Sequence, residues 1–568
     1  MTTLKPNPIF AREKTEEILN GWEFSFDNQQ WQPIRVPFCP QSRLSGIGYT
    51  DFIRECFYRR KLVIDTNGQR VMLHFGAVDY RCSLYINGKY VGGHTGGYTP
   101  FAFDITNFLQ QGENDLLLCV YDEDREARAS GKQSRKKNSF GCFYTRTTGI
   151  WQPVWLEWVP EKHIDQVRFY PNVNEGAVEV DLRVKGEGTY SVIVSFDNEI
   201  VGTAEGEIFN QKKFTIPLSK IKLWALGEGN LYDVRITFNG DVVTSYFGLR
   251  EVRYGGYDFL LNGKPVMQKM VLDQGYYPDG IYTASSIAAM RQDIEMAREL
   301  GFNGSRLHQK VFDPRFLYLC DKAGHMVWGE FPSWGLDCTS MDCFGQFLSE
   351  WTEVLKRDFN HPSIVIWCPL NEVWEGLDGN GKQNDVAFVE GIYGFTKAYD
   401  PTRPCVDVSG GFHGRYTDLF DFHCYGTADE LKRYLDQWDR SAKLDVPLLY
   451  APYGGAQYAE GQPVNVSEYG GIALYANPAT TNAVNEGAVQ NEESWGYGTG
   501  ERDGDAFVER YGQLTELLFQ YPKLSGFCYT QLYDIEQEQN GFYHYDRSDK
   551  LTQQQKEKIR RINANNEI

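Results

Sequence analysis

The strongest constraint on the fold is a regular alternation of helical and short apolar segments after about residue 255. The expected helices cover 285–300, 343–358, 387–399 and 506–519. The expected strands between and around them lie at 266–273, 302–308, 326–331, 364–370, 405–409, 419–425, 463–468 and 526–532. Eight buried strands interleaved with helices are typical of a (β/α)8 TIM barrel, so we predict this fold for residues 251–568.

The first 250 residues have a different pattern and are expected to be all β. Residues 1–158 contain many short strands and the hairpin signal Asn87-Gly88, which favour a β-sandwich. Residues 159–250 alternate apolar and polar side chains, as in 178–184, and have the size of an immunoglobulin-like sandwich. No cysteine lies in this second region, so no disulfide can join its sheets. The prediction is therefore two β-sandwiches followed by a barrel.

Charge and cysteine usage limit the partners and the compartment. A net charge of -19 argues against nucleic acid and anionic membranes, which both require clustered Lys and Arg. The 12 cysteines lie mostly in apolar runs, and the chain start has no apolar signal core. Buried free thiols without a signal favour a cytoplasmic protein. The chain has no C-x-x-C pair and its His residues are scattered, so no metal and no cofactor is expected.

Two carboxylates follow apolar segments at the ends of predicted strands. Residues 364–372 end in Asn371-Glu372, and residues 464–471 contain Glu468. These glutamates would end the fourth and seventh barrel strands, where the chemistry of such barrels takes place. A glycosidase requires a pair of carboxylates, one to protonate the leaving oxygen and one to attack or to activate water. Asn371 can donate a hydrogen bond to a sugar 2-hydroxyl.

Further candidates for substrate binding lie at other strand ends and in the rim loops. Each residue type has a polar or aromatic group suited to a sugar, although structural ion pairs and packing explain the same pattern. The candidates are Asp273, Arg306, His308, His423, Tyr425, Gln531, Trp334 and Trp374.

Four segments resemble glycoside hydrolase family 2, which includes β-galactosidases, β-glucuronidases and β-mannosidases. They cover 147–157, 261–265, 367–372 and 466–471. The resemblance implies a jelly-roll sugar-binding domain, an immunoglobulin-like domain and a catalytic barrel, and a retaining mechanism. It also implies that Glu372 is the acid/base and Glu468 the nucleophile. In the same way it assigns Arg306 to orienting the nucleophile and Tyr425 to hydrogen-bonding it.

One departure from the family pattern affects the expected sugar. β-Glucuronidases carry an Asn-x-Lys motif after strand eight that binds the sugar carboxylate, whereas residues 538–543 here have Glu538 and no Lys. A negative Glu538 would repel a uronate unless it were protonated. The first choice is therefore a β-galactoside.

Several alternatives stay open. A β-glucuronidase or β-galacturonidase could use another cation, such as Lys310 or Arg315, and a β-mannosidase is a further alternative. A catalytically silent carbohydrate-binding protein is the alternative from another class. The expected partners are small glycosides or oligosaccharides. Family β-galactosidases often use metal ions, but no clear site shows here, so none is expected to be essential. Family members are often dimers or tetramers, which favours a homo-oligomer.

Overall fold

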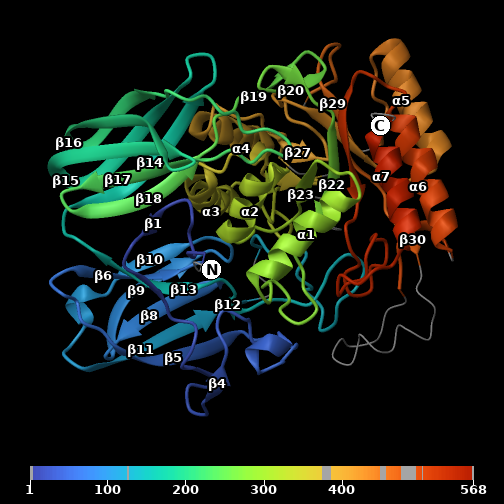
Figure 1. Cartoon of the computed structure of the whole chain (residues 1–568). Helices are drawn as coiled ribbons and strands as arrows, with labels where there is room; N and C mark the ends of the chain where they lie inside the picture. The colour runs from blue at the N-terminus through green and yellow to red at the C-terminus, as the bar shows by residue number, and fades with distance from the viewer. Residues whose placement is uncertain are drawn as a thin grey trace.

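The computed structural model describes residues 4–123, 127–373, 385–447, 449, 456–474, 494–501 and 503–565. Two β-rich units and a barrel follow one another along the chain (Figure 1). This order and these folds confirm the predicted fold class.

The first unit consists of two facing antiparallel sheets and a short strand pair. One sheet has the order β4-β3-β5-β11-β8-β9 and the other β10-β6-β13-β2, while β7 pairs with β12. Alternate residues of β6 and β11 are buried, so one face of each strand contributes to a common core. The strands are β2 (Thr15–Glu17), β3 (Trp22–Ser25), β4 (Gln32–Ile34), β5 (Glu55–Val63), β6 (Arg70–Phe75), β7 (Val78–Asp79), β8 (Arg81–Ile86), β9 (Lys89–Thr95), β10 (Phe101–Asp104), β11 (Glu113–Tyr121), β12 (Gly149–Ile150) and β13 (Val154–Val159), with 3-10 helices at Arg43–Ser45 and Thr106–Phe108.

The second unit is built on long, bent strands. A bulge between Arg183 and Glu187 interrupts the pairing of β15 with β16, and the order of the sheet is β1-β18-β17-β15-β14. The start of the chain, β1 (Ala11–Arg12), thus pairs with the second unit rather than with the first, to which the prediction assigned it. The other strands are β14 (His163–Asn172), β15 (Ala177–Phe196), β16 (Glu199–Pro217), β17 (Tyr232–Phe238) and β18 (Asp241–Phe247).

The third unit is a parallel barrel with helices on its outside (Figure 1). Its sheet has the order β25-β24-β23-β22-β32-β29-β28, and its strands are almost entirely buried, as expected when helices cover one face and the interior is packed. The strands are β22 (Gln268–Asp273), β23 (Gly304–Leu307), β24 (Met326–Glu330), β25 (Ile364–Cys368), β28 (Phe420–Cys424), β29 (Val464–Gly470) and β32 (Leu524–Thr530).

The fifth barrel strand is short and pairs with a continuation of the fourth. β26 (Leu370–Asn371) is parallel to β27 (Val408–Ser409), so only the end of the predicted strand at 405–409 is regular. Smaller strands flank the barrel, namely β19 (Val252–Gly255), β20 (Asp258–Leu261), β21 (Lys264–Pro265), β30 (Ile472–Leu474) and β31 (Tyr497–Glu501).

Three of the seven α-helices in the described part of the chain were not among the four named above. The tail helix α7 begins with a capping box at Thr552, whereas α2 has a capping aspartate and a proline at its start. The helices are α1 (Ile287–Glu299), α2 (Pro314–Ala323), α3 (Asp342–Asp358), α4 (Val386–Tyr399), α5 (Ala428–Ser441), α6 (Gly504–Leu518) and α7 (Gln553–Ala564).

The cysteines agree with the expectation from the sequence. All 12 are free thiols, and those in the barrel strands are buried. None of the described helices is long and apolar enough to cross a membrane.

Candidate active site

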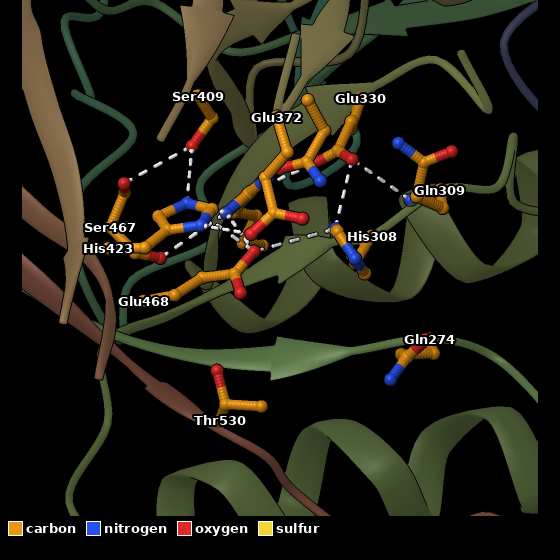
Figure 2. Close-up of polar contacts among 12 residues, drawn as sticks. Gln274, His308, Gln309, Glu330, Glu372, Ser409, His423, Ser467, Glu468 and Thr530 are labelled. Atoms are coloured by element: carbon orange, nitrogen blue, oxygen red, sulfur yellow. Dashed lines mark hydrogen bonds and ion pairs between the residues drawn. The ribbon is translucent and has the colours of Figure 1, made fainter. Parts of the chain in front are cut away.

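The two predicted carboxylates meet at the carboxyl-terminal end of the barrel. Glu468 belongs to β29, and Glu372 directly follows β26. One carboxylate oxygen of each and one ring nitrogen of His423 lie within 4.8 Å of one another (Figure 2). Strands four and seven therefore bring together two acids that are 96 positions apart in the sequence.

Glu468 is held by hydrogen bonds to both of its oxygens. Arg306 Nη1 donates to Oε1 at 2.8 Å, and the hydroxyl of Tyr425 donates to Oε2. Burial would raise the pKa of Glu468, but His423 and Arg306 lower it to about 2. The group is therefore a fixed anion at neutral pH, and the two contacts match the roles expected for Arg306 and Tyr425.

Arg306 links Glu468 to two other side chains. Its guanidinium is fully buried at the end of β23 and donates to Glu330 at 2.7 Å and to Asn371 Oδ1 at 2.6 Å. Glu330 also accepts from the backbone of Gln309 at 3.1 Å. A planar guanidinium with three fixed acceptors holds its neighbours in one geometry.

Glu372 has fewer contacts than Glu468. His423 Nδ1 lies 2.7 Å from Glu372 Oε1, and the Glu372 backbone N–H donates to Ser409 at 2.8 Å. Burial lowers the pKa of His423, but Glu468 and Glu372 raise it above its usual value. Glu372 has a φ of +49°, a left-handed conformation that is uncommon outside glycine and is frequent at functional sites.

Asn371 keeps an available donor next to the carboxylates. Its Oδ1 accepts from Arg306, while its buried Nδ2 has no hydrogen-bond partner among the described residues. Trp334 donates from its indole nitrogen to the Asn371 carbonyl at 3.1 Å, so this predicted aromatic borders the site. The free amide can bind a sugar hydroxyl.

The other predicted residues lie at different distances from the pair. His308 Nδ1 is 2.9 Å from Glu330 and 4.0 Å from Glu468, and burial lowers its pKa well below the usual value, so it is neutral. Gln531 donates to Asn540 at 2.8 Å and accepts from Gln274 at 2.6 Å, rather than contacting either carboxylate among the described residues. Asp273 accepts from Tyr533 and from the Gly275 backbone instead. Trp374 lies outside the described residues.

Neither cation suggested for uronate binding faces the site. Lys310 donates to the carbonyls of Gly275 and Tyr282, and burial lowers its pKa to about 7. Arg315 pairs with Asp313 at 2.6 Å. Both side chains have local structural partners. Contrary to the suggestion from the sequence, neither Lys310 nor Arg315 is placed to bind a uronate.

Several site residues were missed from the sequence. Glu330 ends a predicted strand, which was a usable signal, because polar residues at barrel strand ends gather at one rim. Ser409 lies 3.3 Å from His423, and Tyr497 stacks on Tyr425 with ring centroids 3.6 Å apart. Lys132 extends toward the site from a loop of the first unit, and no local sequence pattern distinguishes it from other lysines.

The cluster of Glu372, His423 and Glu468 has donors that could hold a metal ion. However, Arg306 already lies 2.8 Å from a Glu468 oxygen, and a guanidinium at that distance repels a cation. Tyr425 donates to the other oxygen. The donor set therefore fits a hydrogen-bonded carboxylate pair better than a metal centre.

Comparison with known families follows the three structural units. Residues 50–156 match Glycosyl hydrolases family 2, sugar binding domain, and 162–250 match Glycosyl hydrolases family 2. Residues 252–471 match Glycosyl hydrolases family 2, TIM barrel domain. The chain therefore belongs to glycosyl hydrolases family 2.

Individual relatives are distant. A β-glucuronidase of Felis catus is 25% identical over 551 residues, covering 82% of this chain and 82% of that protein. A β-galactosidase of Thermoanaerobacter pseudethanolicus is 25% identical over 404 residues, covering 66% of this chain and 52% of that protein. The chain spans just over half the length of several curated relatives that it matches.

A solved structure extends this likeness over the whole chain. The family 2 β-galacturonidase of Eisenbergiella tayi superimposes with a TM-score of 0.77 at 20% identity. The superposition covers 99% of this chain and 98% of that one, and it establishes a shared fold.

Proposed function

We propose that the protein is a retaining exo-β-glycosidase that releases a terminal β-linked uronic acid, a glucuronide or a galacturonide. The observation that carries the mechanism is the pair of carboxylates, Glu372 and Glu468, whose oxygens approach within 4.8 Å. Retaining enzymes place the two carboxyl groups about 5–5.5 Å apart, whereas inverting enzymes need about 6.5–9.5 Å to admit a water molecule.

In the proposed first step Glu468 attacks the anomeric carbon and the glycosidic C–O bond breaks. Glu372 gives its proton to the departing oxygen, which leaves as an alcohol, and a glycosyl ester of Glu468 forms. Arg306 and Tyr425 orient the attacking carboxylate because each donates to one of its oxygens. In the second step Glu372 takes a proton from water, which attacks the anomeric carbon and releases Glu468.

The choice of a uronic acid over galactose rests on two kinds of support. One relative matched over 82% of its length is named a β-glucuronidase, and one structural neighbour is named a β-galacturonidase. A buried ammonium group without an anionic partner, that of Lys132, also lies near the carboxylates. The β-galactoside that the sequence favoured becomes the second candidate, and one relative is named a β-galactosidase.

The test is hydrolysis of p-nitrophenyl β-glucuronide, β-galacturonide, β-galactoside and β-mannoside by wild type and Glu468→Gln. Glu509→Gln, on the exposed side of α6, is the matched control. Proton NMR of the first product identifies its anomer. A uronide preferred over both neutral sugars, with the β-anomer formed first, supports the proposal.

Other results would contradict separate parts of it. Preference for a neutral sugar would contradict the assignment of a uronide as substrate. The α-anomer as first product would contradict a retaining mechanism. Binding without turnover favours a silent carbohydrate-binding protein. A cytoplasmic location and a homo-oligomeric state stay predictions, which fractionation and light scattering test.

A further inference from the structure

A loop of the first unit reaches the barrel and carries Lys132. The backbone of Ser130 donates to Trp334 at 2.8 Å, and that of Arg128 donates to Gly335 at 3.0 Å. Gly131 has a φ of +55°, and a side chain there would meet the carbonyl oxygen of Gln309 at 2.4 Å. The loop therefore lies directly against the rim segments that follow β23 and β24.

The residue after Lys132 fixes the loop on its other side. Gln133 donates to Asp79 at 2.7 Å and to the Tyr98 hydroxyl at 2.9 Å. The Lys132 carbonyl accepts from the Tyr144 backbone at 2.8 Å. The position of the lysine is therefore set by contacts on both units.

The Lys132 side chain is buried without any polar partner. It is 7% exposed, yet its ammonium makes no hydrogen bond or ion pair with any described residue. A largely buried ammonium without a hydrogen-bond partner is costly, so a ligand that accepts its hydrogen bonds is favoured there. The three N–H donors are therefore available to a bound molecule.

The ammonium lies beside the catalytic carboxylates. It sits 5.2 Å from the ring centre of Trp334, whose indole nitrogen donates to the backbone of Asn371, the neighbour of Glu372. Burial lowers the pKa of Lys132, but Cys142 and the carboxylates of Glu538, Glu468 and Glu372 raise it above its usual value. The amine is charged at neutral pH.

Glu538, which argued against a uronate, has its oxygens already engaged. The hydroxyl of Tyr144 donates to Oε2, and Asn540 donates to Oε1 at 2.9 Å. Burial also raises the pKa of Glu538. Both of its oxygens are thus hydrogen-bonded and burial disfavours its charged form, whereas the hydrogen-bonding capacity of Lys132 is unused.

We propose that Lys132 binds the carboxylate of the terminal uronic acid, so that a residue of the sugar-binding unit selects the substrate of the barrel. This inference rests on the proposed function. An ammonium and a carboxylate form a charge-assisted hydrogen bond, and the low-dielectric surroundings strengthen it relative to one in water. A neutral galactoside has a hydroxymethyl group at that position and cannot compensate the charge.

The experiment compares wild type, Lys132→Met and the control Lys136→Met, an exposed lysine of the same loop. The kcat/KM is measured on p-nitrophenyl β-glucuronide, β-galacturonide and β-galactoside. Calorimetry measures binding of free glucuronate and galacturonate. Lys132→Met should lose at least about 30-fold in kcat/KM on the uronide, since truncating one partner of a buried charge pair costs that much. The galactoside should change by about twofold, as Lys136→Met should for all substrates.

Circular dichroism checks the fold, and Lys132→Gln, which keeps a donor without the charge, replaces Lys132→Met if the latter does not fold. An unchanged ratio of uronide to galactoside hydrolysis in the lysine variant overturns the role of Lys132 and leaves the proposed function standing. A wild type that neither hydrolyses nor binds a uronic acid overturns both.

Discussion

The two carboxylates of the site have contrasting surroundings. Glu468 lies within a buried strand, accepts hydrogen bonds on both oxygens and has a pKa near 2. Glu372 follows a two-residue strand in a left-handed conformation, and its side chain is 13% exposed. Glu468 is thus held as a fixed anion, whereas Glu372 is held by fewer contacts and is more exposed. This difference in how firmly the two side chains are held is what the proposed division into nucleophile and acid/base would require.

The largest expected effect comes from removing the fixed anion. Glu468→Gln should reduce kcat/KM by about 10⁴-fold or more, because no glycosyl ester can form, and losses of this size follow removal of a nucleophile. Steady-state hydrolysis of the preferred p-nitrophenyl glycoside measures it, with Glu509→Gln as the control. Residual activity within tenfold of wild type would exclude Glu468 as the nucleophile.

Removal of the proton donor should give a selective loss. Glu372→Ala should reduce the rate on an alkyl glycoside by about 10²–10⁴-fold, because a poor leaving group needs protonation. A substrate with a very good leaving group, such as dinitrophenol, should lose much less in the glycosylation step. Pre-steady-state rates on the two substrates measure this difference, and equal losses on both would exclude Glu372 as the general acid.

The hydrogen bond from the Tyr425 hydroxyl to Glu468 provides a test with a smaller expected effect. Tyr425→Phe removes a hydroxyl that donates to Glu468 and should reduce kcat/KM by about 10- to 150-fold, the value of a hydrogen bond to a charged group. The control is Tyr458→Phe, whose hydroxyl donates to a backbone carbonyl away from the carboxylates. Equal effects of both variants would mean that the hydroxyl contributes only to folding.

A buried charge network behind the site should make stability depend on pH. His413 lies between Asp407 at 2.7 Å and Asp421 at 3.3 Å, and Asp421 accepts from Ser409 beside His423. Burial lowers the pKa of His413, but Asp407 raises it to about 9. Since this folded value exceeds the unfolded one of about 6.5, the stabilisation is complete below pH 6.5 and is lost as pH rises through 9.

Thermal unfolding of wild type and His413→Gln at pH 6 and pH 10 measures that dependence. The loss of unfolding free energy caused by His413→Gln should be on the order of 2–3 kcal/mol larger at pH 6 than at pH 10. His163→Asn, at a partly exposed position, is the control. A difference between wild type and His413→Gln that does not change with pH would mean that the imidazole is not charged.

The smallest expected effect concerns metal ions. Dialysis against EDTA should leave kcat/KM unchanged, because Arg306 and Tyr425 already occupy the oxygens of Glu468. Loss of activity that magnesium or manganese restores would contradict this expectation.

Local sequence patterns predicted the barrel strands and the chemistry at their ends. Glu372 and Glu468 follow apolar segments, and Arg306 and Tyr425 lie near the ends of predicted strands. Parallel strands bring such ends to one rim. Lys132 could not be found in this way, because it comes from a loop of another unit and its position depends on long-range contacts. Lys310 lies near a strand end and was therefore suggested as a uronate-binding cation, but its ammonium donates to backbone carbonyls instead.

The docking of the 128–133 loop on the barrel has an evolutionary consequence. The proposed catalytic acids and the proposed selector of the sugar belong to different structural units of one polypeptide. A change in this loop can therefore alter which glycoside is accepted while the reaction itself stays the same. Relatives that share the barrel acids can therefore accept different glycosides, because the residues that select the sugar lie outside the barrel motifs.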